Sequence, residues 1–549
     1  MKSKSFRSKL PGTFARLTST LLGLAGCLLL AVPRPAVAAF GTTASGGGFI
    51  VNNGANLVFT INSSGDMSSC KYKGTELNDT SKASGIASGL GASSVTATTS
   101  GSYITIKCVS TAISSSAITH YYVVQSGVDN IYMATYVTSE PSVGELRYIF
   151  RGQYNVIPNG PAPSNNNGNT GAIESSDVFG HSGGTTTSKY YGNERAKDLT
   201  VKGASGSGVG VYVAFGTREC SSGGPFFHDI ENQGDGAGSD QEIYNYMNSG
   251  HNQTEAYRVS NVLHGPYAFC FTTGSAPAVP SFNFISALGL TGFIPTTGRG
   301  TVHGTASGLD SGTTGMVGFA NSTAQFWAPV SGGAYTCNYM RPGTYTATLY
   351  QGELGVATGT ASVTAGGNTT LNLTSALAHP TTIWKIGTWD GTPNEFLNGQ
   401  TLISRHPSDS RNPSWGPVTY AVGSAINKFP AVQFRADNSP TTVTFSLTSA
   451  QVAAHTLKIG ITCAYNGGRP SVTVNGHALS NPGASSQPSS RSITIGTYRG
   501  NNTTFTYSIP AADFVSGANT MTITPISGSS DLGTWLSASW AYDCVELDN

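Results

Sequence analysis

Two groups of side chains in the first half of the chain are suited to acid–base chemistry on an anionic substrate. They are Tyr244, Tyr246 and His251 on an expected loop-like segment, and the basic residues Arg147, Arg151 and Lys189 upstream of it. Arginine binds carboxylates, while lysine, histidine and tyrosine exchange protons. Together these residues predict a site that holds an acidic sugar and takes a proton from it, which favours an enzyme over a passive binder.

The spacing of the basic residues supports this interpretation. Arg147 and Arg151 are four residues apart, which places both on one face of a strand. Two guanidinium groups on one face repel each other unless an anion lies between them. A partly buried Lys189 near such cations is expected to have a lowered pKa and to act as a base. The tyrosines offer a stacking surface for sugar rings.

Simpler explanations exist for each of these residues. The arginines can form an exposed, salt-bridged face with Glu145 as partner, a single lysine is usually solvated, and tyrosines two apart often only pack together. A glycoside hydrolase would instead need two carboxylic acids beside the scissile bond. The candidates for such a pair are Glu174, Asp177, Asp229, Asp235, Asp240, Glu242 and Glu255.

The elements that must position these residues are strands. Short runs of alternating apolar and polar residues recur between clusters of Gly, Ser and Asn, at residues 103–108, 119–124, 210–215 and 442–447. This pattern is typical of antiparallel sheets, and hardly any stretch has a sustained helical period. A chain with only 10% charged residues and 69 Gly in 549 is typically a secreted all-β protein. Residues 159–168 and 232–238 are expected to be long loops, where sites are often built.

The N-terminus has the features of a secretory signal peptide. Basic residues precede a short apolar run at residues 21–32, and a small-x-small motif ends at Ala38. Residues 1–38 are therefore expected to be removed, which leaves a secreted, extracellular protein without a membrane span. Removing six basic and no acidic residues changes the formal net charge from +1 to −5. Nucleic acid is then not an expected partner.

Seven cysteines follow residue 38, and none has a spacing typical of a metal site. Because seven is odd, at least one thiol is free or pairs with another chain. We expect a disulfide between Cys70 and Cys108, which lie on neighbouring strand-like segments, and we assign no partner to the other five.

A mature chain of about 510 residues is too long for one core, so several domains are expected. Residues 39–285 carry the groups described above. Residues 286–375 are expected to form a small seven-stranded sandwich of the fibronectin type III kind. Residues 376–549 are expected to form a jelly roll that resembles carbohydrate-binding modules, in which the first and last strands typically pair.

Several segments resemble the fungal-type rhamnogalacturonan lyases of polysaccharide lyase family 4. They lie at residues 141–147, 172–178, 221–226, 246–255, 263–267, 299–308, 406–411, 467–470 and 543–547. This resemblance covers essentially the whole mature chain. It implies an endolyase that cleaves the rhamnose–galacturonate backbone of rhamnogalacturonan I, a branched pectin, by β-elimination. It also implies three all-β domains: a galactose-mutarotase-like β super-sandwich, a fibronectin type III-like domain and a carbohydrate-binding-like jelly roll.

The same resemblance implies roles for individual residues. They are Lys189 as the base, His251 as the acid, Arg147 and Arg151 as contacts of the uronate, and Tyr244 and Tyr246 as residues that line the cleft. No metal is expected in catalysis, although Asp543 is a candidate ligand for a structural calcium ion. The expected partner is rhamnogalacturonan I, bound by a monomer, with neither nucleic acid nor membrane involved.

Two features depart from the family pattern. The family has a disulfide between the lysine loop and the next strand, whereas this chain has no cysteine between Arg195 and Glu219. Asn252 forms a glycosylation sequon beside His251, where a glycan would obstruct the cleft. Two other functions stay open from the sequence, namely a non-catalytic pectin-binding protein and a glycoside hydrolase.

Overall fold

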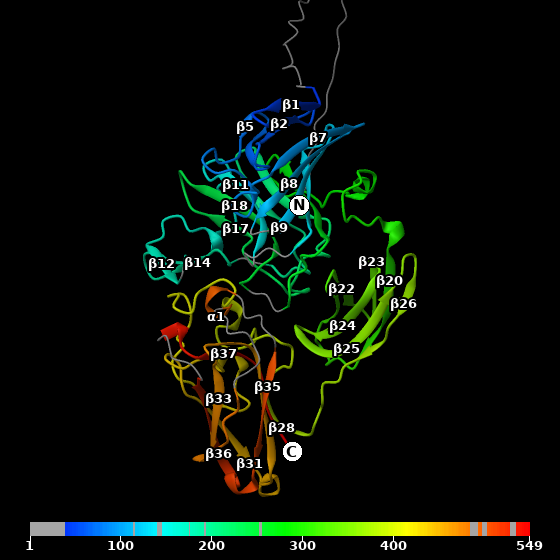
Figure 1. Ribbon diagram of the computed structural model, residues 1–549. Helices are drawn as coiled ribbons and strands as arrows, with labels where there is room; N and C mark the ends of the chain where they lie inside the picture. Colours follow the sequence, from blue (N-terminus) through cyan, green and yellow to red (C-terminus); the bar gives the residue numbers. More distant parts are fainter. Residues whose placement is uncertain are drawn as a thin grey trace, which may run out of the picture. The chain divides into compact units, whose positions relative to one another are not determined.

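The computed structural model describes residues 39–549, apart from 114–115, 140–144, 175, 192–193, 252–254, 484–491, 497–501 and 528–533. The expected leader at residues 1–38 and the sequon residue Asn252 therefore lie outside the described residues. The regular structure that is described is nearly all β (Figure 1). The four alternating runs at 103–108, 119–124, 210–215 and 442–447 all lie within strands, as predicted. Of the helices in the described ranges, none is long and apolar enough to cross a membrane.

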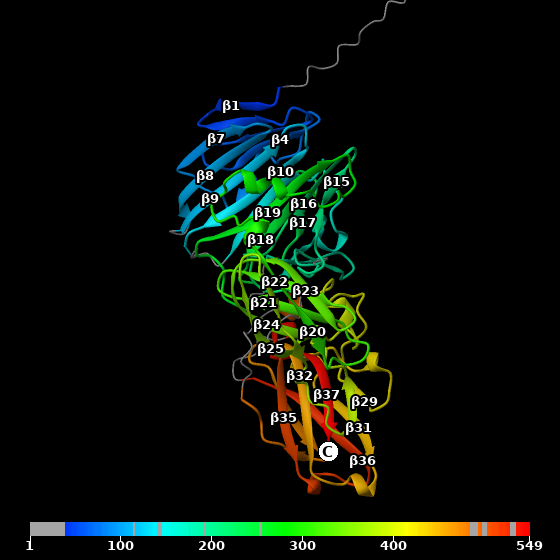
Figure 2. The ribbon, with the colours of Figure 1, turned by 90° about the vertical axis from the view of Figure 1, so that its right-hand side faces the viewer.

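The first part of the chain contains two large sheets (Figure 2). The five-stranded sheet follows chain order: β1 (Gly41–Ser45), β2 (Gly48–Asn52), β3 (Leu57–Ile61), β4 (Met67–Tyr72) and β5 (Thr75–Glu76). The seven-stranded sheet has the order β15 (Val201–Gly206), β16 (Val209–Phe215), β19 (Val262–Thr272), β10 (Asn130–Val137), β9 (Ser116–Gln125), β8 (Tyr103–Ile113) and β7 (Ser94–Ser100).

Two smaller sheets carry the residues of interest. One has the order β17 (Asn232–Gly234), β18 (Asp240–Asn248), β11 (Leu146–Gln153) and β6 (Gly85–Ile86). The other has the order β12 (Gly171–Glu174), β13 (Val178–Gly180) and β14 (Thr186–Ser188). The segment expected as a loop at 232–238 thus begins as strand β17, and the one at 159–168 contains a short 3-10 helix.

The core of the first part determines which face of β11 is free for a site. Phe59 from β3 and Tyr148 and Phe150 from β11 are fully buried in one apolar cluster. Because successive side chains of a strand point to opposite faces, Arg147 and Arg151 lie on the face away from this core. The same-face placement predicted from their spacing is confirmed.

The second part is a sandwich of two sheets. One sheet has the order β23 (Ala334–Met340), β20 (Gly300–Ser307) and β26 (Asn368–Thr370), with β27 (Leu373–Thr374) also paired to β20. The other has the order β22 (Gln325–Val330), β21 (Gly315–Ala320), β24 (Gly343–Gln351) and β25 (Leu354–Val363). The described strands number eight rather than the expected seven, because β26 and β27 are two short strands that run parallel to β20 in succession.

The third part contains two five-stranded sheets. The first has the order β28 (Thr382–Gly387), β37 (Ser539–Asp548), β32 (His455–Tyr465) and β35 (Thr503–Ile509), with β30 (Val432–Phe434) paired to β37. The second has the order β29 (Thr419–Ala421), β31 (Thr441–Leu447), β36 (Gly517–Ile526), β33 (Arg469–Val474) and β34 (His477–Ala478). The first and last strands of the third part, β28 and β37, pair with each other, as expected of a jelly roll.

Helices are few and short in the described chain. The α-helix is α1 (Ser492–Ile495). The 3-10 helices are η1 (Ala162–Ser164), η2 (Asn283–Ala287), η3 (Thr296–Gly298), η4 (Gly399–Thr401), η5 (Ile426–Lys428), η6 (Ser449–Gln451), η7 (Ala511–Asp513) and η8 (Thr534–Leu536).

The predicted disulfide is not present in the structure. Cys70 and Cys108 are both buried and both free, as are the other five cysteines of the described chain. Cys70 lies on β4 opposite Phe59, and Cys108 lies on β8 in a different sheet. Both thiols are free, contrary to the prediction, and each packs as an apolar side chain in the core of the first part.

Candidate active site

The pairing of β11 with β18 builds one wall of the site. Arg147 lies opposite Tyr246, and its guanidinium carbon is 5.6 Å from the centroid of the Tyr246 ring. The Tyr244 and Tyr246 rings are stacked with centroids 5.8 Å apart. Contrary to the expectation of a loop, both tyrosines lie within strand β18, all of whose residues are buried. The strand therefore fixes both rings, and His251 follows just beyond its end.

His251 is held between two carboxylates. Its Nε2–H donates to Glu145 Oε1 at 2.9 Å, and its Nδ1–H points to the Asp229 oxygens at 3.3 and 3.4 Å. Burial alone would lower the pKa of His251, but the hydrogen bonds and charges of Asp229 and Glu145 outweigh it and raise the pKa to about 10. The ring is therefore an imidazolium at neutral pH, and it is 26% exposed, so a substrate can reach it.

Glu145 joins the imidazolium to the arginine. Its second carboxylate oxygen accepts a hydrogen bond from Arg147 Nη1. The hydrogen bond from His251 is the largest cause that holds the pKa of Glu145 below its usual value, despite partial burial. The Glu145 carboxylate therefore lies between Arg147 and the His251 imidazolium. The Nε–H of Arg147 is buried and has no hydrogen-bond partner among the described residues.

Lys189 lies immediately after β14, next to this group. Its Nζ is 3.4 Å from Asp177 Oδ1, and its side chain is 20% exposed. The ring of the next residue, Tyr190, meets the His251 ring edge-on with centroids 5.3 Å apart. Burial raises the pKa of Tyr190, and the charges of Asp229 and Asp177 raise it further. Lys189 with its partner Asp177, and the His251 imidazolium, thus lie on either side of Tyr190 in one cluster of charged groups.

Arg151 and Tyr244 form a second group further along the same strands. Arg151 Nε donates to Glu242 Oε1 at 3.2 Å, and its Nη1 donates to the backbone carbonyl of Ala83 at 2.7 Å. The hydroxyl of Tyr244 lies within hydrogen-bonding distance of the Glu242 carboxylate and of Gln233 Oε1, the latter at 3.0 Å. Glu242 therefore joins Arg151 to Tyr244, as Glu145 joins Arg147 to His251.

The carboxylates considered for a hydrolytic pair are each engaged with a cation or a polar donor. Their partners are His406 and Thr494 for Glu174, Lys189 for Asp177, His251 for Asp229, Gln233 for Asp235, Lys82 for Asp240, Arg151 for Glu242 and Arg258 for Glu255. The structure thus uses Asp229 and Asp177 to support His251 and Lys189.

Sequence reasoning missed Tyr190 and did not connect Asp229 with His251. Asp229 is 22 residues before His251, and no local pattern links them. The hydroxyl of Tyr190 is buried without a hydrogen-bond partner among the described residues, so it is a further polar group beside His251. Glu145 was recognised only as a partner of Arg147, because its contact with His251 depends on the β11–β18 register.

The strands that lead to Lys189 are held by residues from the third part of the chain. Asp409 Oδ2 accepts hydrogen bonds from the backbone N–H and the hydroxyl of Thr186, at 2.7 and 2.8 Å. Arg411 Nη2 contacts the same oxygen of Asp409 at 2.6 Å. The hydroxyl of Thr494 in α1 donates to Glu174 at 2.9 Å. Residues more than 200 positions away in sequence thus fix both ends of the β12–β14 sheet.

The region around Asp543 was considered for a calcium ion. Asp543 Oδ1 accepts the backbone N–H groups of Gly391 and Asp390, at 2.7 and 3.1 Å. Burial raises the pKa of Asp543, and the charge of Asp390 adds to this. Within the described ranges, no group of three or more His, Cys, Asp or Glu residues is arranged to hold a metal ion. Asp543 therefore serves as an acceptor for a backbone turn.

Comparison with known proteins covers most of the described chain. Three family descriptions match: "Rhamnogalacturonan lyase B, N-terminal" at residues 40–292, "Polysaccharide lyase family 4, domain II" at 298–371 and "Polysaccharide lyase family 4, domain III" at 382–547. Rhamnogalacturonate lyase A of Aspergillus aculeatus is 45% identical over 520 residues, which is 93% of this chain and 96% of that protein. Rhamnogalacturonate lyase A of Emericella nidulans is 44% identical over 524 residues, or 94% and 97%. These matches confirm the resemblance and the all-β, three-domain class predicted from sequence, and the chain belongs to polysaccharide lyase family 4.

Proposed function

We propose that the protein is a secreted, monomeric endolyase that cleaves the rhamnose–galacturonate backbone of rhamnogalacturonan I by β-elimination. Relatives named rhamnogalacturonate lyases align along almost its entire length, which supports this substrate. Membership of a lyase family argues against the hydrolase and the passive binder. The observation that carries the proposal is the imidazolium of His251, which a single carboxylate joins to Arg147.

The reaction needs three functions. The carboxylate of the uronate must be neutralised, because the proton on the adjacent carbon is only weakly acidic. A base must take that proton. The electron pair of the broken carbon–hydrogen bond then forms the carbon–carbon double bond as the bond to the glycosidic oxygen breaks. The leaving oxygen must receive a proton. We assign the base to Lys189 and the acid to the imidazolium of His251.

Glu145 indicates where the uronate would bind. A carboxylate already lies against Arg147, so the carboxylate of a substrate can make the same contact when Glu145 gives way, which also frees the Nε2–H of His251 for the leaving oxygen. The unmet Nε of Arg147 offers a further donor. Tyr246 is buried beside Arg147 and Tyr244, so it would hold the guanidinium group in place for the uronate. Arg151 and Tyr244 would support this wall through Glu242 rather than contact the uronate directly.

The proposal assigns no step to a metal ion, because Arg147 supplies the positive charge at the carboxylate. Chelation with EDTA should therefore leave the initial rate unchanged. A rate that falls on chelation and returns with added calcium would contradict this part of the proposal.

The test is the ultraviolet absorbance of the mature protein incubated with rhamnogalacturonan I, with homogalacturonan as the control polymer. Elimination produces a double bond conjugated with the carboxylate, so the absorbance should rise with rhamnogalacturonan I alone. New reducing ends without absorbance would indicate hydrolysis. Saturable binding with neither signal would indicate a pectin-binding protein.

A further inference from the structure

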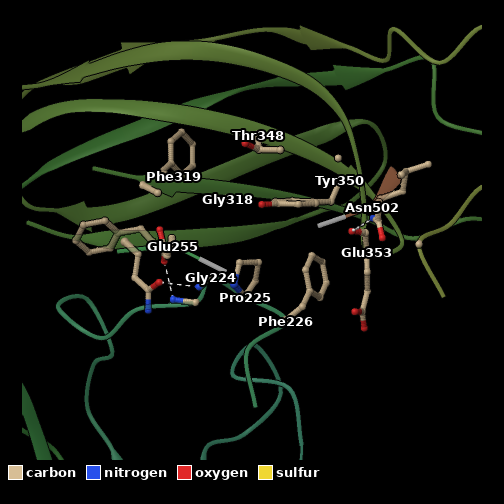
Figure 3. Close-up of a pocket in the computed structure, with 17 residues that line it drawn as sticks. Gly224, Pro225, Phe226, Glu255, Gly318, Phe319, Thr348, Tyr350, Glu353 and Asn502 are labelled. Carbon is tan, nitrogen blue, oxygen red and sulfur yellow. Dashed lines mark hydrogen bonds between the residues drawn. The ribbon is translucent and has the colours of Figure 1, made fainter. Parts of the chain in front are cut away.

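A second cavity lies against the outer face of the β22-β21-β24-β25 sheet (Figure 3). Its volume is about 430 Å³, within the usual range for small-molecule sites. Its walls come from the sheet, from the turn at residues 223–226 with Glu255, and from Glu353 and Asn502. None of Arg147, Lys189, Tyr246 and His251 lines it, so it is separate from the candidate active site.

An aromatic surface forms part of this cavity. The ring of Tyr350 meets the ring of Phe226 edge-on, with centroids 5.0 Å apart and planes at 82°. Gly318 on the neighbouring strand has no side chain to fill the space beside the Tyr350 ring. A Cβ at this position would lie 3.0 Å from Tyr350 Cε2. Figure 3 shows Tyr350 along the sheet, with Phe226 and Pro225 across from it. Such a fixed ring beside open space suits the apolar C–H face of a sugar.

The charged groups of the cavity are both acidic. Glu255 is bound by Arg258 through two contacts of 2.9 Å and by the backbone N–H of Gly223 at 2.6 Å. Glu353 Oε1 accepts from Arg195 Nε at 2.8 Å. Neither arginine lines the cavity, and its described lining contains no Lys, Arg or His.

This charge distribution selects the class of ligand. A uronate entering the cavity would face two carboxylates and no lining cation, which is unfavourable. A neutral sugar has no charge to neutralise, and its hydroxyl groups can donate to carboxylate oxygens that have remaining lone pairs. The hydroxyl of Thr348, on the same face of β24 as Tyr350, adds a further polar group.

We propose that this cavity binds neutral sugar units carried as side chains by the branched polysaccharide substrate. The assignment rests on the proposed function, because it takes the ligand to be part of the same polymer. Backbone uronates then go to Arg147, which has a donor left unmet, and neutral branches go to the aromatic cavity around Tyr350, whose described lining offers no cation. The two sites thereby sort the two kinds of sugar.

Titration calorimetry on the full mature protein tests the proposal. The probes are β-1,4-linked galactotetraose and α-1,5-linked arabinotetraose, with tetragalacturonate as the charged comparison. We expect saturable binding of at least one neutral probe that tetragalacturonate does not displace. Thr348→Trp places a bulky ring in the cavity and should weaken this binding tenfold or more. The matched control is Thr360→Trp, on the exposed face of β25 outside the cavity, which should bind as the wild type does.

Tyr350→Ala gives a second variant, which removes the ring instead of filling the space. Thermal unfolding verifies that each variant is folded. Failure of both neutral probes to bind the wild type, or equal binding by Thr348→Trp, would overturn the proposal. The ultraviolet assay on debranched rhamnogalacturonan I should give the wild-type rate with Thr348→Trp. A wild type that binds the neutral probe but produces no absorbance would refute the lyase assignment and leave the cavity assignment intact.

Discussion

At the scale of single residues, the proposed roles of Lys189 as base and His251 as acid predict that the Lys189→Ala and His251→Ala variants both lose most of their lyase activity. Each change removes one proton-transfer group, which typically costs roughly 10²- to 10⁴-fold in rate. The loss should appear in kcat on rhamnogalacturonan I, while thermal unfolding stays close to that of the wild type. Lys197→Ala is a suitable control, because Lys197 pairs only with the exposed Asp198 in the same segment. Near-normal turnover in both variants would disprove the roles assigned here.

The carboxylates around His251 predict an unusual titration. The folded pKa of about 10 lies above the unfolded value of 6.5, so the protonated ring stabilises the fold fully below about pH 6.5. This contribution is lost as the pH rises from 6.5 to 10. NMR titration of the imidazole should show the raised pKa in the wild type and a pKa closer to 6.5 in the Glu145→Gln/Asp229→Asn double variant. An unchanged pKa in the double variant would show that other groups hold the proton.

The sequence predicted only those side-chain relations that follow from strand periodicity. The shared face of Arg147 and Arg151 follows from a spacing of four, and the structure confirms it. The contact between His251 and Asp229 depends on how separate segments meet, and their separation of 22 residues gives no signal for it. The state of Cys70 and Cys108 also depends on side-chain geometry that the sequence does not give: both are buried in one core, and both are free.

At the scale of elements, the strand that ends just before Lys189 depends on support from the third part of the chain. Asp409→Ala removes the acceptor for two hydrogen bonds from Thr186, so β14 should become more mobile. We expect lower kcat with a smaller change in KM, together with faster hydrogen exchange of the amides at residues 186–189. Asp198→Ala, which alters an exposed carboxylate paired only with Lys197, is the matched control. Unchanged exchange and unchanged kcat in Asp409→Ala would show that β14 holds Lys189 without this support.

Two of the predicted strands have faces with distinct surroundings: the runs in β8 and β31 alternate between buried and more exposed residues. The runs in β9 and β16 are also strands, as predicted, although most of their residues are buried. Strand β18 was expected as a loop because its sequence alternates weakly, and the structure explains why: all nine of its residues are buried. A strand covered on both sides gives no polar face for the alternation to reveal.

At the scale of the whole molecule, composition was a good guide to class. Abundant Gly and scarce charge predicted sheets joined by turns, and first and last strands of the third part pair as the jelly roll requires. Composition does not determine how the parts support one another. The contacts of Asp409 and Thr494 with the β12–β14 sheet join residues that lie 223 and 320 positions apart. Only the folded chain reveals that the third part, expected as a binding accessory, also supports the strand before Lys189.

The cysteines give a prediction for the entire fold. All seven in the described chain are free and buried, and burial raises the pKa of Cys108, Cys220, Cys270 and Cys337 to about 12. A buried thiol with a raised pKa is a poor nucleophile. The native mature protein should therefore react with no equivalent of a thiol reagent such as Ellman's reagent, and seven thiols should react after unfolding in guanidinium chloride.

A reducing agent tests the same point independently. Since the described chain has no disulfide to constrain its unfolded state, dithiothreitol should leave the thermal midpoint unchanged. Five reactive thiols after unfolding, with a midpoint that falls on reduction, would instead indicate one bridge. In that case a Cys70→Ser/Cys108→Ser double variant would show whether it is the bridge first expected from the sequence: if it is, the midpoint of this variant no longer responds to dithiothreitol.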